Sequence, residues 1–300
     1  MISGVKKPLI FFHISLAAGC KTMAILRRKF PDDSFCRIVA RKNFKPKKGL
    51  LSVEGLKKLP TEEISKIIFL AGHMSFGIHT AFPTPCDYIT MLRDPISRTI
   101  SQYYYLTMNP THEDHGFVKD MSLEEYAGSN MSGANNFQVR LLSAKHEFSS
   151  VDKFDLPKDA LEIAKKNLKE HFKVVGVAEK FAETMLAAKS VFNWGNVYYG
   201  TRHIHPDDPR RPADNEIAPR VVRIIKENNQ LDLDLYKYAC ELLSESIKKE
   251  YGGDFPKIFA RFNRINNFLQ FARAMEFLED INSVKRRMLK LAKRFTNKFL

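Results

Sequence analysis

The stretch CDYITMLRDPISRTISQYYYL at residues 86–106 decides how the rest of the chain is interpreted. Its first part, CDYITML, is rich in β-branched and aromatic residues and carries no charge after Asp87, which predicts a buried strand. Asp94 and Pro95 predict the start of a helix. Asp94 would be the N-cap, and Pro95 would take the first helical position, where a missing N–H costs nothing.

A strand, a turn and a helix N-terminus together form a common anion-binding corner, because free backbone N–H groups and the helix dipole point outward there. Arg93 lies where the predicted strand ends, and Arg98 and Ser101 lie one turn apart on the helix. Two arginines and a serine hydroxyl around such a corner predict a phosphate site. The short motif R-D-P alone is also compatible with an ordinary corner in which Arg93 forms a surface ion pair.

Composition narrows the class of protein and of partner. The 300 residues are 44% hydrophobic and 27% charged, enough for one large domain or two small ones with a sizeable core. The net charge of +14 predicts an anionic partner such as a nucleotide, an acidic glycan, nucleic acid or a membrane surface. No nucleic-acid-binding motif is visible, and aromatic residues do not interleave with the basic runs, so nucleic acid is not expected.

The cysteines and the N-terminus bear on the compartment. The four cysteines, at positions 20, 36, 86 and 240, form no C-x-x-C motif or Cys/His cluster, which argues against a zinc site and suits a reducing compartment. The N-terminal stretch resembles a signal peptide, but Pro8 opens its apolar run, His13 interrupts it, and PLIFFHI fits a first strand. We therefore expect a cytoplasmic protein, and the lack of 18 consecutive apolar residues predicts no transmembrane helix.

Strands that alternate with helices predict an α/β fold with a mainly parallel sheet. Strands are expected at 8–14, 35–40, 66–72, 86–92, 173–177 and 196–200. Helices are expected at 20–30, 61–66, 95–106, 121–129, 133–143, 158–171, 179–192 and 231–251.

The C-terminal part has a different character. GGDFP at 252–256 is typical of a hinge, so we expect a domain over 1–251 and a basic helical extension over 252–300. The last segment, residues 285–300, gathers apolar side chains on one face and Lys and Arg around the rest. This pattern fits a helix packed on its own domain or on a second copy of the chain, and it also fits a helix at a membrane surface.

LRDPISRTISQYYYL resembles the 3′-phosphate-binding segment of sulfotransferases that use the donor PAPS (3′-phosphoadenosine 5′-phosphosulfate). The nearest group is the carbohydrate type related to heparan sulfate 2-O-sulfotransferase, with many bacterial members. The segments FFHI, GHMSFGIH, NNFQVRLLS, KVVGVAEKF and NVYYGTR follow in the order of that family, so the resemblance covers roughly residues 8–250. It implies a three-layer, P-loop-like fold. It also implies transfer of a sulfuryl group to a hydroxyl of a glycan or glycolipid, with PAP as the product nucleotide and no metal.

The resemblance also assigns roles to single residues. Arg93 and Ser101 fall on the positions that hold the 3′-phosphate. His73 matches the histidine of the G-H motif, the base that takes the hydroxyl proton. Because His73 follows the strand at 66–72, we expect it at the carboxyl edge of the sheet, where ligands bind in α/β folds. His79, six residues on, would contact the acceptor or merely pack.

A second stretch of the resemblance concerns the acceptor side. Asn135, Gln138 and Arg140 match an N-x-x-Q-x-R stretch near nucleotide and acceptor, and at helical spacing Asn135 and Gln138 share a face. A capped surface helix is the alternative. Arg202, Arg210 and Arg211 lie in one polar loop. This loop either closes over the nucleotide or the acceptor, or is simply solvated.

The first loop departs from the family pattern P-K-T-G/A-G-T-S/T. Leu16 stands where the family has the lysine that touches the leaving group, and Ala17 replaces a hydroxyl residue. We expect the donor's 5′ end to be held by backbone N–H groups and a helix N-terminus, with Lys21 supplying the missing charge; the alternative is a solvated Lys21. The loop residues concerned are Ser15, Ala18, Gly19, Cys20, Lys21 and Thr22.

Two other functions follow from the same loop. SLAAGCKT loosely matches a Walker A motif, with Ser15 and Cys20 in place of both glycines, which leaves a P-loop kinase or NTPase as a second enzyme class. The non-enzymatic alternative is a nucleotide-binding or glycan-binding homologue that has lost turnover through Leu16 and Ala17.

Overall fold

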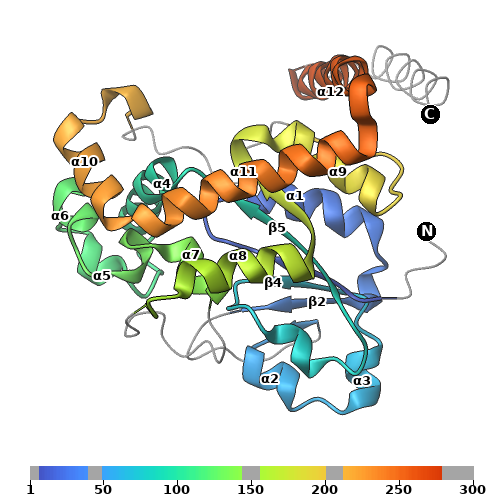
Figure 1. The fold of residues 1–300 in the computed structure, drawn as a ribbon, viewed down its shortest axis with the longest axis horizontal. Coiled ribbons are helices and arrows are strands. Elements are labelled where there is room, and N and C mark those ends of the chain that lie inside the picture. Colours follow the sequence, from blue (N-terminus) through green and yellow to red (C-terminus); the bar gives the residue numbers. More distant parts are fainter. Residues whose placement is uncertain (1–6, 40–48, 144–155, 201–211, 279–300) are drawn as a thin grey trace.

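The computed structural model of the chain describes residues 7–39, 49–143, 156–200 and 212–278. Within these ranges a six-stranded sheet runs in the order β3-β2-β4-β1-β5-β6, and all of its pairs are parallel. The expected α/β fold with a parallel sheet flanked by helices is therefore confirmed (Figure 1). The strands are β1 (Leu9–Phe12), β2 (Phe35–Ile38), β3 (Leu50–Leu51), β4 (Phe69–Gly72), β5 (Asp87–Leu92) and β6 (Phe172–Val177).

The helices connect the strands and continue beyond the last one. They are α1 (Gly19–Leu26), α2 (Val53–Lys57), α3 (Thr61–Ser65), α4 (Pro95–Met108), α5 (His115–Val118), α6 (Leu123–Ala127), α7 (Phe137–Ser143), α8 (Ala160–His171), α9 (Phe181–Val191), α10 (Pro219–Asn228), α11 (Gln230–Tyr251) and α12 (Phe255–Leu278).

The two faces of the sheet carry different helices. Side chains alternate along each strand, so Phe11 and Phe12 point to opposite faces. The Phe11 face is covered by α1 and α9: Gly19 of α1 lies against His13, and Thr184 of α9 lies against Gly176 of β6. The opposite face carries α8 and α11, which cross the front of the sheet in Figure 1.

The stretch that resembled a leader forms a central strand. All four residues of β1, LIFF, are buried between β4 and β5. A continuous apolar run is what a parallel strand covered on both faces requires. The described residues hold no helix long and apolar enough to cross a membrane.

One sequence-based expectation for secondary structure was wrong, and several elements were not predicted. Residues 196–200 form no strand, because Tyr198 and Tyr199 pack on Phe262 of α12 instead of joining the sheet. The helix α10 was not assigned from the sequence, although Pro219 occupies its first turn. The short elements β3 and α2 were also missed, because two and five residues carry little periodic signal.

The chain turns between α11 and α12 as expected. Gly252 adopts a φ of 53°, and α12 begins at Phe255. Phe262 is buried, and Asn266 accepts a hydrogen bond from the Tyr199 N–H at 2.9 Å, so the first half of α12 packs on the domain. The division into 1–251 and 252–300 stays a prediction, and the basic segment 285–300 lies outside the described residues.

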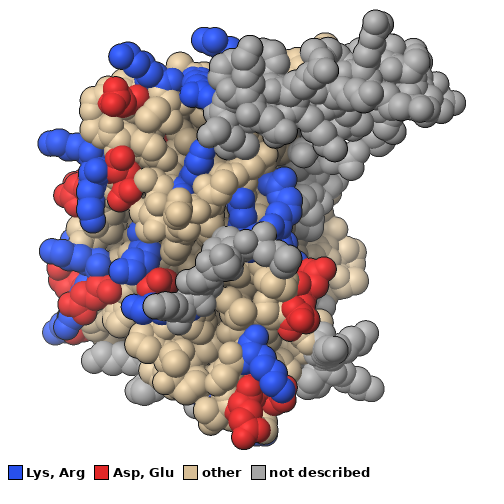
Figure 2. Space-filling model, turned by 90° about the vertical axis from the view of Figure 1, so that its right-hand side faces the viewer, with Lys and Arg blue, Asp and Glu red and all other residues tan. Residues whose placement is uncertain are grey.

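Figure 2 shows Lys and Arg side chains in scattered groups over the face that it draws, with groups of Asp and Glu between them. Where such side chains gather they lower one another's pKa: the pKa of Lys29 is lowered by burial and by the positive charges of Arg28 and Lys189. An excess of positive charge on an open face favours anionic partners over cationic ones.

Candidate active site

The corner between β5 and α4 has the geometry that its sequence predicts. The Asp94 carboxylate accepts a hydrogen bond from the Ser97 N–H at 2.9 Å, and Pro95 occupies the first turn of α4. This confirms Asp94 as the N-cap. The Arg93 guanidinium donates to the Leu16 carbonyl at 2.8 Å and lies 3.9 Å from the Glu179 carboxylate. Arg93 thus connects this corner to the first loop.

The backbone of Arg93 is clamped by the side chain of Gln138. The Arg93 N–H donates to Gln138 Oε1 at 3.0 Å, and Gln138 Nε2 donates to the Arg93 carbonyl at 2.9 Å. The Asp232 carboxylate in turn accepts the N–H groups of Gln138 and Val139 at 3.0 and 2.8 Å. Gln138 is fully buried. Its amide therefore positions Arg93, and its role as an acceptor contact stays a prediction.

Arg98 does not lie at the anion-binding corner as expected. Its side chain is fully buried, donates to the Gly133 carbonyl and lies 4.8 Å from the Phe137 ring centre. Burial lowers the pKa of Arg98 and raises that of Asp232, and the attraction between their charges opposes both shifts. Arg98 is thus part of the interior. Ser101 is half-buried on α4, and its role as a phosphate ligand stays a prediction.

The corner between β1 and α1 is built differently. Leu16 and Ala18 adopt left-handed φ angles of 63° and 56°, and no side chain caps α1. The first N–H groups of a helix have no partner within it, so this uncapped end presents free donors. A Cβ on Gly19 would come within 1.6 Å of His13 Nε2, so only glycine fits there. Thr22 is buried and donates to the Ala18 carbonyl, which turns its hydroxyl inward.

His73 emerges at the carboxyl edge of β4, beside this loop. Its Nδ1 lies 3.0 Å from the His13 carbonyl and 3.2 Å from Ser15 Oγ, and its ring stacks on His13 with centres 4.2 Å apart. A carbonyl can only accept a hydrogen bond, so Nδ1 carries the hydrogen of the neutral ring and Nε2 carries the free lone pair. Nε2 is therefore the atom that can take a proton.

The surroundings keep His73 neutral. Burial lowers its pKa, the hydrogen bond to the His13 carbonyl acts the other way, and the charges of Arg37 and His112 lower it further. Burial, His73 and Arg37 hold the pKa of His13 well below its usual range. A neutral imidazole at neutral pH is the form that a general base requires.

Sequence analysis missed three residues around His73. His13 ends the first apolar run, Arg37 interrupts an otherwise apolar strand, and His112 follows α4. A polar or charged residue near the carboxyl end of a buried strand was the signal that could have found the first two. Arg37 also opposes the rise in the pKa of the Cys20 thiol that burial causes.

The candidate cations of the first loop have other contacts. The Lys21 ammonium lies 4.3 Å from the ring centres of both Phe181 and Tyr199, and burial lowers its pKa. Arg27 lies over the Phe35 ring and pairs with Asp32, at the far end of α1. The role of Lys21 at the leaving group therefore stays a prediction.

His79 lies on the other face of the sheet from His73. Its Nδ1 is 2.9 Å from the Tyr88 hydroxyl, and its ring centre is 5.0 Å from that of His171, which precedes β6. In β5, Ile89 pairs with Phe11 and faces α1, so its neighbour Tyr88 points to the opposite face. His79, which contacts Tyr88, is therefore on the opposite face from His73.

Asn135 and Arg140 bind each other. Arg140 donates to the backbone carbonyl of Asn135 at 2.8 Å and to its side-chain oxygen at 3.0 Å. Asn135 precedes α7 and is separated from it by Asn136, whose φ is 43°, so Asn135 and Gln138 do not share a helical face. Arg202, Arg210 and Arg211 lie outside the described residues.

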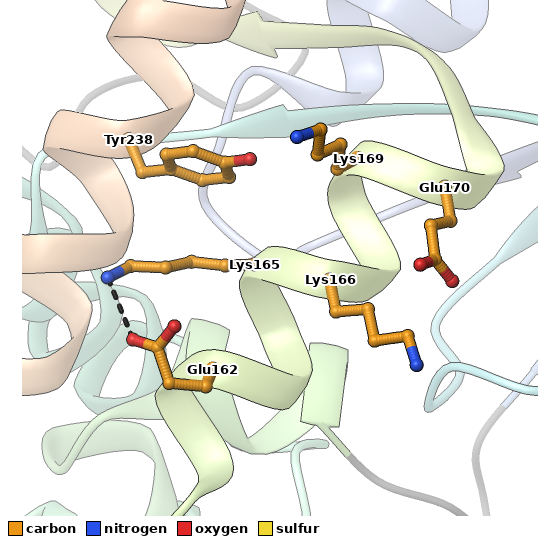
Figure 3. Close-up of a pocket in the computed structure, with 6 residues that line it drawn as sticks. All are labelled: Glu162, Lys165, Lys166, Lys169, Glu170 and Tyr238. Atoms are coloured by element: carbon orange, nitrogen blue, oxygen red, sulfur yellow. Dashed lines mark hydrogen bonds and ion pairs between the residues drawn. The ribbon is translucent and has the colours of Figure 1, made fainter.

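A shallow depression of about 290 Å³ lies between α8 and α11 (Figure 3). Within it Lys165 pairs with Glu162 at 3.0 Å, so its charges partly neutralise each other. The residues around it are Glu162, Lys165, Lys166, Lys169, Glu170 and Tyr238. The second half of α8 leads to the amino end of β6, so this depression is not the site at the carboxyl edge.

Comparisons with known proteins support the resemblance in its broader form. The sequence matches no protein-family model. It is 31% identical over 180 residues to human heparan-sulfate 6-O-sulfotransferase 2, which covers 52% of this chain and 29% of that protein. It is 29% identical over 182 residues to chicken heparan-sulfate 6-O-sulfotransferase 1, covering 52% and 43%. For the human 6-O-sulfotransferase 1 the values are 28% over 188 residues, 54% and 44%.

The chain thus spans less than half the length of each of these relatives. The sequence analysis named the 2-O-sulfotransferases as the nearest group, whereas these relatives carry the 6-O name. What the comparisons establish is distant homology, over about half of the chain, to carbohydrate sulfotransferases of the heparan-sulfate type.

Proposed function

We propose that this protein is a sulfotransferase that moves the sulfuryl group of PAPS to a hydroxyl of a carbohydrate acceptor. The acceptor oxygen forms a bond to sulfur, and the bond from sulfur to the bridging oxygen breaks. The electron pair of that bond stays on the 5′-phosphate of PAP, and the hydroxyl proton goes to His73. The products are a sulfate ester, PAP and a proton.

The placement of His73 is the observation that carries this proposal. Its Nδ1 hydrogen is committed to the His13 carbonyl, so the Nε2 lone pair can accept a proton at the carboxyl edge of the sheet. The helix α1, whose N-terminus has no side-chain cap, begins beside the same carboxyl edge of the sheet. A base next to an anion-binding helix end is the arrangement that in-line sulfuryl transfer needs.

The 3′-phosphate of the donor would bind at the corner between β5 and α4. Arg93 and Ser101 lie at and after the end of β5, the neighbour of β1 in the sheet. The Arg93 side chain donates to the Leu16 carbonyl, so it connects the loop after β5 to the loop after β1. A nucleotide with phosphates at its 3′ and 5′ ends matches two such corners.

Titration of the full chain with PAP, followed by transfer assays with PAPS over an acceptor panel, tests the proposal. We expect His73→Ala to abolish transfer and to leave PAP affinity near that of the wild type, because the partner of Nε2 is the acceptor hydroxyl. His79→Ala is the matched control, because His79 lies on the other face of the sheet. Wild-type transfer by His73→Ala would assign the base elsewhere, and a wild type without PAP binding would end the proposal.

One observation favours a second function, a homologue that binds nucleotide or glycan without turnover. Leu16 offers only its carbonyl, which accepts the hydrogen bond from Arg93, and its side chain cannot stabilise a leaving group. PAP binding by a wild type that transfers nothing would favour this alternative.

A further inference from the structure

Arg37 is a charge within an otherwise buried strand. Its neighbours in β2, Cys36 and Ile38, are buried, whereas Arg37 is exposed. In the sheet Arg37 pairs with Ala71 of β4, and Ala71 pairs with Phe11 of β1, so the three form one row on one face. That face is the one on which Phe11 and His13 stack and His73 stacks on His13.

The distance from Arg37 to His73 suits an arginine side chain. Neighbouring strands lie about 4.8 Å apart and two residues advance about 6.6 Å, which separates the two Cα atoms by about 8 Å. Ala71 between them has only a methyl group, so the row leaves room for the guanidinium. The charge of Arg37 acts on His13, His73 and Cys20, the last in the first turn of α1. The strand register thus places Arg37 on the face of the sheet that α1 covers.

The Arg37 side chain is also available to a ligand. Within the described ranges its guanidinium has no hydrogen bond or ion pair, whereas Lys21 lies between two aromatic rings and Arg27 pairs with Asp32. An arginine keeps its charge at every pH that a protein tolerates, and its planar fork matches two oxygens of one anion. A positive charge without a partner at an anion site is available to the ligand.

We propose that Arg37 takes the place of the lysine that Leu16 replaces, which rests on the proposed function above. Arg37 binds the sulfonate end of PAPS and stabilises the electron pair that develops on the bridging oxygen as the bond to sulfur breaks. His73, its neighbour across Ala71, takes the acceptor proton in the same step. The charge needed by the first loop thus comes from β2 rather than from the loop itself.

The test compares Arg37→Ala with Lys21→Ala in the full chain, by PAP titration, PAPS hydrolysis without acceptor, and transfer. We expect Arg37→Ala to lower both hydrolysis and transfer about 100-fold, the usual effect of removing one preorganised electrostatic group. PAP affinity should fall less than turnover, because PAP lacks the sulfonate. Arg37→Lys should retain part of the activity, and Leu16→Lys added to Arg37→Ala should recover it. Lys173→Ala, which removes another exposed cation from a strand of the same sheet, is the control.

Several outcomes would overturn the assignment. Unchanged hydrolysis and transfer in Arg37→Ala, or a loss confined to Lys21→Ala, would place the charge elsewhere. A raised acceptor KM with normal PAPS hydrolysis would make Arg37 an acceptor contact instead. A wild type that binds PAP without turning over PAPS would also remove this role, whereas a wild type that does not bind PAP would refute the proposed function itself.

Discussion

The two strand–loop–helix corners of this protein are both candidate anion sites, but their side chains come from different parts of the chain. At β5–α4 the charge, the cap and the helix start follow one another in the chain as Arg93, Asp94 and Pro95. At β1–α1 no side chain caps the helix, and the groups around its end come from other strands: His73 from the end of β4 and Arg37 from β2. The first corner is encoded locally, and the second is assembled by the sheet.

The difference has a physical consequence for what each corner can bind. Asp94 already accepts the Ser97 N–H, so the end of α4 keeps a carboxylate of its own, and anion binding there depends on Arg93. The end of α1 has no such competitor, so its backbone donors remain for a ligand. For PAP affinity, we therefore expect charge removal to matter most at the β5–α4 corner and steric change to matter most at the β1–α1 corner.

The largest effect on PAP affinity is expected from Arg93→Ala. A hydrogen bond to a charged group contributes about 1.5–3 kcal/mol, so PAP affinity should fall about 10- to 100-fold, and the Leu16 carbonyl also loses its donor. Ser101→Ala should cost less, because a hydroxyl carries no charge. Calorimetric titration with PAP measures both, with Lys173→Ala as the control. Wild-type affinity in both variants would remove the nucleotide from this corner.

Gly19→Ala tests the other corner through its shape. The new Cβ would overlap the His13 ring, and overpacking of this kind costs about 1–3 kcal/mol of the free energy of unfolding. Thermal unfolding and PAP titration measure the loss of stability and of the loop's binding geometry. Gly116→Ala, whose Cβ would meet nothing within 4 Å, is the control and should have little effect. Recovery in Gly19→Ala/His13→Ala would attribute the damage to this contact, and an unaffected single variant would contradict it.

The contrast between the corners also explains what could be predicted from the sequence. Asp94 and Pro95 signal a helix start by themselves, and β1 and β5 are apolar runs that a parallel sheet requires, so the fold and the β5–α4 corner followed from local patterns. Arg98 could not be placed, because its position on α4 does not say which helix face the later chain covers. Arg37 and His13 were missed for a related reason: only the pairing of β1, β2 and β4 brings them to His73.

Gln138 shows the same limit within a recognised motif. Its spacing predicted that Gln138 and Asn135 lie on the same face of one helix. The left-handed backbone of Asn136 instead separates Asn135 from α7, which begins at Phe137. The Gln138 amide turns inward to the backbone of Arg93. The motif thus located a residue next to the candidate site without revealing that its amide binds the backbone of Arg93.

The smallest effect concerns pH, and at the β1–α1 corner it comes from His13 and His73. His13 and His73 have folded-state pKa values below the value of about 6.5 that an unfolded histidine has. Below that pH the unfolded chain binds protons that the folded chain does not, so the free energy of unfolding should fall as the pH drops. The limit is about 1.4 kcal/mol per histidine per pH unit. Urea unfolding between pH 7.5 and 5.5 measures the slope, which should flatten in His13→Asn. A stability that rises on acidification, or an unchanged slope in His13→Asn, would mean that burial at the end of the sheet does not hold these rings neutral.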